Sequence, residues 1–237
     1  MYYIESYNDQ FQEIAHYRKM PQMMPWVGKS YGDVKVKKIL FIGESHYLPE
    51  NSKIHKDSEK WYKINYKEMK PTELIWTSTA KIIANKYGDV WNDKGWNKAH
   101  NIYKNIEEII KITGSNLESK QMLEFCAFYN YFQRPAQEKG QSIIYDSKDL
   151  EVADEVFLKI VKTIRPEYIF VTSSKVWPYV KEKSKELEII SDFSPHPGCA
   201  WWNRRAKKYG TNSDGKYLNG KGKVIIFLKE HSVFNTY

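Results

Sequence analysis

The chain is poor in cysteine and has neither a long apolar run nor a glycine-rich phosphate-binding loop. Its two cysteines, Cys126 and Cys199, are too few for a disulfide framework or for a four-cysteine metal or iron-sulfur site. No apolar run approaches the ~18 residues of a membrane span. The start, MYYIESYNDQ, lacks the basic and apolar regions of a signal peptide. These absences predict a cytoplasmic protein with no membrane partner.

Several classes of catalytic site are also missing from the sequence. The six histidines show neither HxH nor HExxH spacing, so we expect no metal site. The segment GESHYLPE, after the first apolar run, matches neither GxxxxGK nor GxGxxG, which argues against these nucleotide-binding enzymes. GESHY also departs from the GxSxG of serine hydrolases. We therefore expect an activity that needs no cofactor.

The composition is that of a folded, basic protein. Hydrophobic residues make up 41% and aromatic residues 15% of the 237 positions, enough for a sizeable core, and we expect one domain over 1–237. Lys and Arg number 37 against 29 Asp and Glu, a formal charge of +8. That sign fits a polyanionic partner, although interleaved Lys and Glu would also give a mildly basic solvated surface.

Strand-like and helix-like patterns alternate along the chain. Helical periodicity is predicted over 9–20, 73–87, 99–112 and 152–164, with Asp149 or a nearby polar residue capping the last, and again through 176–179. Strands are predicted at KKILFIG (37–43), MLEFCAFYNYF (122–132), YIFVTSS (168–174), EIISDF (188–193) and KVIIFLK (223–229). Strands separated by helices predict an α/β fold, with a mostly parallel central sheet and helices on both faces.

Parallel sheets bind ligands beyond the carboxyl ends of their strands, so the residues there are the first candidates for chemistry. They are Glu44, Ser45 and His46 after the first strand, Asn130 in the second, Ser173 and Ser174 after the third, and His196 after the fourth.

A carboxylate, an amide and an imidazole among these residues suit hydrolysis of an N-glycosidic bond. In its transition state the sugar becomes positive and the departing base negative. Glu44 could orient or deprotonate water, His196 could donate to the oxyanion on the base, and Asn130 could read a pyrimidine edge. Taken singly, each residue could equally satisfy backbone groups at the end of a strand.

Four segments resemble, in order, the motifs of the uracil-DNA glycosylase superfamily. GESHY resembles its first motif, known in forms such as GQDPYH and GEAPG, and FYNYFQRP resembles the second strand with its base-reading Asn. TIRPEYIFVTSSKVW resembles the proline turn, strand and small-residue turn, and SPHPGCAWWNRR resembles the HPS-type motif. The resemblance implies a uracil-DNA glycosylase-like fold. It also implies a monofunctional DNA glycosylase that flips a uracil-like or modified base from DNA and leaves an abasic site.

The resemblance also assigns roles to residues. It makes Glu44 the water-activating position, as in the GEAPG branch, Asn130 the base-edge reader and His196 the oxyanion donor. Gly43 would let the backbone approach the flipped base. Tyr47 falls where GQDPYH enzymes have a tyrosine that excludes 5-methyl pyrimidines, but the altered residues before it could move that ring, so strict uracil specificity is not expected.

The chain also departs from the family pattern. Ser45 and His46 replace the usual small or acidic residue and proline, although we still expect Ser45 in the substrate pocket. Gly198 replaces a serine, and the iron-sulfur cysteines of the GEAPG branch are missing. These departures leave open which base is excised.

The segment CAWWNRRAKKYG corresponds to the loop that penetrates the duplex in the family. We expect DNA, single- or double-stranded, to contact this segment of a monomeric protein. Trp201 or Trp202 would fill the gap left by the flipped nucleotide, and Arg204, Arg205 and Lys207 would neutralise phosphates. An amphipathic helix with its tryptophans in the core would give the same pattern.

The long segment 48–121 should supply an aromatic ring that stacks on the base. Trp61, Tyr62 and Trp76 are the candidates, and core packing is the alternative for each. The segment could also widen the pocket for a hypermodified base of foreign phage DNA. Two further alternatives remain: a catalytically silent DNA-binding protein on the same fold, and an unrelated hydrolase of small nucleosides or nucleotides.

Overall fold

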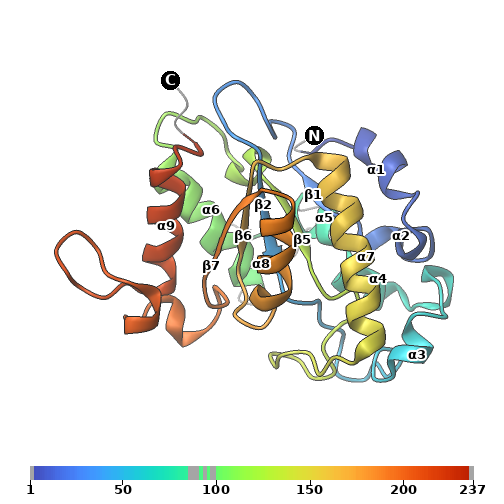
Figure 1. The fold of residues 1–237 in the computed structure, drawn as a ribbon. Helices are drawn as coiled ribbons and strands as arrows, with labels where there is room; N and C mark the ends of the chain where they lie inside the picture. Colours follow the sequence, from blue (N-terminus) through green and yellow to red (C-terminus); the bar gives the residue numbers. More distant parts are fainter. Residues whose placement is uncertain (1–2, 85–90, 93–94, 97–99, 235–237) are drawn as a thin grey trace.

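A sheet of five strands runs through the middle of the molecule (Figure 1). The computed structural model describes residues 3–84, 91–92, 95–96 and 100–234. Across the sheet the order is β1 (Trp26–Val27), β5 (Ala127–Asn130), β2 (Ile39–Gly43), β6 (Tyr168–Val171) and β7 (Ile190–Phe193). The last four are parallel, and β1 pairs antiparallel with β5. The mostly parallel sheet predicted from the sequence is confirmed.

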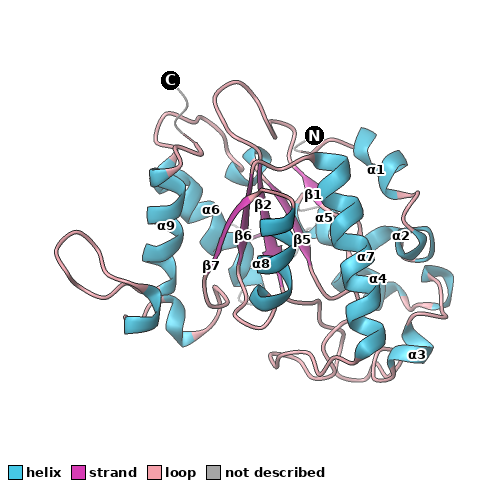
Figure 2. Cartoon of the chain, viewed as in Figure 1, coloured by secondary structure: helices cyan, strands magenta, loops and turns pink. Residues whose placement is uncertain are grey.

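Helices cover both faces of the sheet. As a result, every residue of its central strands β5, β2 and β6 is buried. Leu40 and Ile42 of β2 pack into one core with residues of α1 (Ser6–Phe11), α7 (Ser147–Ile164) and α8 (Trp177–Glu186). Ile39 and Phe41 point the other way, toward α6 (Asn101–Thr113) and α9 (Gly220–Glu230). Figure 2 shows α7 and α8 in front of the strands.

Helix α7 begins with a side-chain cap. Asp146 accepts hydrogen bonds from the backbone N–H groups of Lys148 and Asp149. Asp149 returns a bond to the Asp146 backbone, which completes a capping box. The predicted polar cap is therefore Asp146. No helix in the described part of the chain is long and apolar enough to cross a bilayer.

The prediction of a last strand at KVIIFLK was wrong, since these residues belong to helix α9. Its buried side chains, Val224, Phe227 and Leu228, follow the spacing of one helical face, whereas Ile225 and Ile226 are only partly buried. The Asn219 side chain accepts a hydrogen bond from the Gly222 N–H at 2.7 Å and caps the helix. The apolar run resembles a buried strand, but the cap before it starts a helix.

Other boundaries also differ from the predicted ones. The segment 9–20 forms parts of two short helices, α1 and α2 (Ala15–Lys19), and the segment 73–87 forms α4 (Pro71–Thr77) and α5 (Thr79–Ile83), with 85–87 outside the described residues. The strand predicted at 122–132 is shorter, because a 3-10 turn over Met122–Phe125 precedes β5. The remaining elements are α3 (Ser58–Trp61), the hairpin β3 (Trp91–Asn92) and β4 (Gly95–Trp96), and short 3-10 turns at Pro21–Met23, Tyr66–Glu68, Ala200–Trp202 and Lys207–Tyr209.

Candidate functional site

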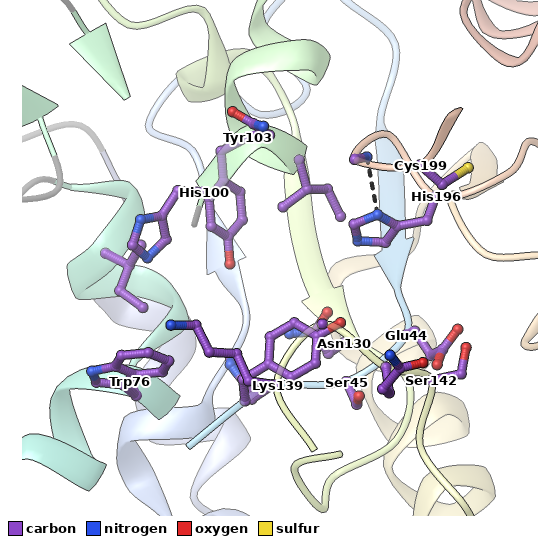
Figure 3. Close-up of a pocket in the computed structure, with 18 residues that line it drawn as sticks. Glu44, Ser45, Trp76, His100, Tyr103, Asn130, Lys139, Ser142, His196 and Cys199 are labelled. Carbon is purple, nitrogen blue, oxygen red and sulfur yellow. Dashed lines mark hydrogen bonds between the residues drawn. The ribbon is translucent and has the colours of Figure 1, made fainter. Parts of the chain in front are cut away.

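A cavity of about 470 Å³ opens at the carboxyl edge of the parallel strands. Side chains from the ends of β2 and β5, the loop after β7, helices α4 and α6, and the loop 139–142 line it (Figure 3). Seven of the candidates from the sequence meet there, namely Glu44, Ser45, His46, Tyr47, Trp76, Asn130 and His196. The edge that the strand order singles out is therefore where the polar candidates converge.

Hydrogen bonds to both of its oxygens hold the carboxylate of Glu44 in place. The backbone N–H of Ile143 donates to Oε1 at 3.1 Å, and the hydroxyl of Ser173 donates to Oε2 at 2.7 Å. The same hydroxyl accepts from the backbone N–H of Lys175 at 3.2 Å, which directs its proton toward Glu44. Since a carboxylate oxygen has two lone pairs, Glu44 keeps the capacity to bind a water molecule.

Asn130 ends β5 directly beside Gly43, its register partner in β2. The residue is 7% exposed, and its side-chain amide lines the cavity and forms no hydrogen bond with any described residue. A Cβ on Gly43 would lie 2.2 Å from Asn130 Oδ1, so the glycine makes room for the amide. Gly43 is expected to bring the backbone close to a base, and in the structure it also makes room for Asn130. Since the amide lines the cavity without a protein partner, it is open to pairing with a ligand there.

The ring of His196 is held in one tautomer by its own loop. The backbone N–H of Gly198 donates to Nδ1 at 3.0 Å, so in the neutral ring the proton sits on Nε2 (Figure 3). Asn105 of α6 anchors the loop by donating to the Pro197 carbonyl at 2.8 Å. Burial lowers the pKa of His196 below its ordinary value, although the Glu44 carboxylate acts in the opposite direction. His196 therefore presents a neutral N–H donor.

His46 lines the same cavity, but its contacts are structural. Its Nε2 pairs with the Thr79 hydroxyl at 3.0 Å at the start of α5, and its backbone carbonyl accepts from the Ala136 N–H. Only 6% of the residue is exposed, and this burial lowers its pKa from 6.5 to about 4. His46 holds the loop after β2 against α5 in the neutral form.

Acid should destabilise the protein through His46. An unfolded histidine with a pKa near 6.5 takes up a proton at about pH 5, whereas the folded residue does not. The unfolded state then binds more protons, so the free energy of unfolding should fall as the pH drops from about 7 toward 4. We expect His46 to account for about 2 kcal/mol of that fall at about pH 5.

Urea denaturation near neutrality and at about pH 5 measures this loss directly. A His46→Gln variant keeps a hydrogen-bonding group for Thr79 but cannot take up a proton, so its stability should depend less on pH. If the variant and the wild type lose the same free energy on acidification, His46 is not the titrating group.

The candidates for base stacking separate by burial. Trp61 is fully buried, with its ring N–H donating to the Gln133 carbonyl, and Tyr62 is buried with its hydroxyl donating to Asp149. Only Trp76 lines the cavity, with the ammonium of Lys139 5.4 Å from the centre of its ring. Trp76 is therefore the candidate that remains for contact with a ligand.

Two aromatic residues of the cavity lining beyond Trp76 were not singled out by the sequence. His100 and Tyr103, at the start of α6, line the cavity, and their rings stack with centroids 6.1 Å apart. The ring of Tyr103 also meets Phe128 of β5 edge-on at 5.1 Å. The spacing of three residues predicts that His100 and Tyr103 share a face, but not that this face borders the cavity.

The segment after His196 divides its two tryptophans between core and surface. Trp202 is 1% exposed and packs against the start of α9, so the expectation that it contacts DNA is corrected. Trp201 is 46% exposed, with the Lys208 ammonium 5.1 Å from its ring centre. The predicted phosphate contacts, Arg204, Arg205 and Lys207, are all exposed.

The described side chains form no metal site, and comparisons with known proteins assign no family. Among the residues that the structure describes, no three His, Cys, Asp or Glu side chains are grouped to hold a metal ion. The chain matches no protein-family model, and no curated protein shows significant sequence similarity to it.

Proposed function

We propose that the protein is a monofunctional DNA glycosylase that hydrolyses the N-glycosidic bond of a flipped uracil-like or modified base. One observation carries the proposal: the amide of Asn130, which has no partner among the described residues, shares a cavity with the fixed carboxylate of Glu44 and the N–H donor of His196. An amide can donate and accept at once, which matches the edge of a pyrimidine. Carboxylate and donor match the two charges of the transition state.

The groups act at different atoms of the substrate. As the bond from sugar C1′ to base N1 breaks, its electron pair moves onto the base, and the negative charge reaches the base O2. The Nε2–H of His196 stabilises that oxyanion. Glu44 stabilises the positive sugar and takes a proton from water as the water oxygen bonds to C1′. The products are an abasic site and, after protonation, the free base.

The surface beside the cavity supports a polymeric substrate. Trp201 and the exposed cations Arg204, Arg205 and Lys207 follow within a few residues of His196 and Cys199, which line the cavity. Within the described residues, none of these three cations forms an ion pair. Free cations that follow the pocket residues closely in the chain suit phosphates on either side of a flipped nucleotide.

Replacing Arg204 and Arg205 together by Ala should weaken binding to modified and unmodified DNA alike. Each lost phosphate contact reduces the slope of log K against log salt by about one, so we expect a reduction of up to about two. Binding titrations over a range of salt concentrations measure this slope, and the preference between bases should not change.

A double variant at Lys35 and Lys162 is the matched control. Both lysines are exposed and lie at the amino end of the sheet, before β2 and at the end of α7. The control removes two positive charges at the amino end of the sheet, away from the cavity, and should leave the slope of log K against log salt nearly unchanged. Equal slopes for the two double variants would remove the segment after His196 from the DNA-binding surface.

The decisive experiment is base release from oligonucleotides that carry uracil or modified pyrimidines, followed by alkali to cut abasic sites. A glycosylase produces cut strands. A catalytically silent DNA-binding protein would bind the oligonucleotides without cuts, and a hydrolase of small nucleosides would prefer free deoxyuridine. Either of these two results would overturn the proposal.

A further inference from the structure

The cavity is larger than a flipped pyrimidine requires. Its volume of about 470 Å³ falls within the range of about 300–1,000 Å³ found for clefts that hold drug-sized ligands. A pyrimidine is a single ring, and Glu44, Asn130 and His196 account for its contacts. The remaining volume lies along the wall formed by Trp76, His100 and Tyr103 (Figure 3).

The order of the residues around the cavity fixes which part of the base faces that volume. In Figure 3, His196 and Glu44 lie on one side, Asn130 lies in the middle, and Trp76 and His100 lie on the other side. Around a pyrimidine, O2 is followed by N3, then the 4-substituent and then C5. With O2 at His196 and N3 at Asn130, the substituent at C5 points toward Trp76 and His100.

The chemistry of this wall is mixed rather than apolar. Trp76 offers a flat aromatic ring, His100 and Tyr103 carry polar ring atoms, and the exposed Lys139 places its ammonium over one face of the Trp76 ring. Gln141 adds an amide from the same loop. An aromatic face surrounded by hydrogen-bonding groups suits a ligand that has both C–H faces and hydroxyl groups.

We propose that Trp76, His100, Tyr103 and Lys139 form a subsite for a bulky, hydroxyl-bearing substituent at C5 of the target pyrimidine, such as a sugar. The inference rests on the proposed glycosylase activity and names its substrate class. A hydroxyl-rich group stacks on the indole of Trp76 and receives hydrogen bonds from Lys139. A base without the substituent leaves this subsite to water.

The test compares oligonucleotides that differ only at C5 of the target base. Uracil and cytosine series carry hydrogen, methyl, hydroxymethyl or glucosylated hydroxymethyl at that position. In either the uracil or the cytosine series, we expect kcat/KM for the glucosylated base to exceed that for the unsubstituted base by at least about tenfold. If the protein releases uracil but releases no glucosylated base, the subsite is excluded while the glycosylase proposal stands.

Variants connect the preference to the wall. Trp76→Ala and Lys139→Ala should each lower the ratio of kcat/KM between glucosylated and unsubstituted base by about tenfold or more. Lys53→Ala, an exposed lysine outside the cavity, is the control and should leave this ratio as it is. An unchanged ratio in both wall variants contradicts the assignment.

Binding gives a readout that does not depend on catalysis. A 2′-fluoro sugar resists hydrolysis, so the same C5 series in 2′-fluoro oligonucleotides reports affinity alone. The subsite predicts tighter binding of the glucosylated member, whether or not any base is released. Failure to release any base from the hydrolysable oligonucleotides would refute the proposed activity, but not the subsite. Equal affinity across the series would refute the subsite.

Discussion

Replacing Glu44 by Gln should lower the rate of base release by about 10² to 10⁴, the usual contribution of a general base or charge-stabilising carboxylate. The substitution removes the negative charge but keeps the shape of the side chain. An amide oxygen can still accept from the Ile143 N–H, and an amide N–H can still pair with the Ser173 hydroxyl. The fold and DNA affinity should therefore survive, and single-turnover release from a modified oligonucleotide measures the loss.

Glu50→Gln is the matched control, because Glu50 is exposed, follows the same strand and lies outside the cavity. It removes one charge near the site but should leave the rate nearly unchanged. A fully active Glu44→Gln enzyme would exclude Glu44 as the group that acts on water. A large fall in thermal stability would instead mean that the carboxylate mainly holds the loop at Ile143 in place.

The carboxyl edge of the sheet could be predicted from the sequence because it depends on local patterns. Apolar runs indicate β2, β5 and β6, a shorter mixed segment indicates β7, and parallel strands bring the residues that follow them to one edge. Glu44, Asn130 and His196 therefore meet as expected. Ser173, one of the strand-end residues, contacts Glu44 for the same reason.

The parts that failed depend on tertiary contacts or on short local signals. The run at 223–229 has strand-like composition, and only the Asn219 cap and the burial of one face distinguish α9 from a strand. Nothing local tells Trp201 from Trp202, because the packing against α9 decides which ring is buried. Similarly, the contact between α6 and the cavity depends on how the whole helix packs.

Gly43 shows that a glycine at the end of a strand can also serve the neighbouring strand. Such a glycine suggests close approach by a ligand, and in this structure it makes room for the amide oxygen of Asn130. Any larger residue at position 43 would displace the amide that the proposal assigns to the base. The pair Gly43 and Asn130 is therefore one unit of the site, even though 86 residues of sequence lie between the two.

Replacing His196 by Ala should slow base release by about 10² to 10³, the cost of losing one preorganised donor at a developing oxyanion. Among the described residues, the ring of His196 is bonded by the Gly198 N–H alone, and Asn105 anchors the loop independently through Pro197. The melting temperature should therefore change little. Insoluble protein, or a much lower melting temperature at unchanged activity per folded molecule, would make His196 a structural residue.

A change of leaving group separates oxyanion stabilisation from other roles of His196. Fluorine at C5 withdraws electrons, so the anion of 5-fluorouracil is more stable than that of uracil and needs less help from a donor. The loss caused by His196→Ala should therefore be smaller for 5-fluorouracil than for uracil, whereas the loss caused by Glu44→Gln should be similar for both. Parallel single-turnover measurements on the two oligonucleotides give this comparison. Equal losses for His196→Ala on both bases would show that His196 does not act on the departing base.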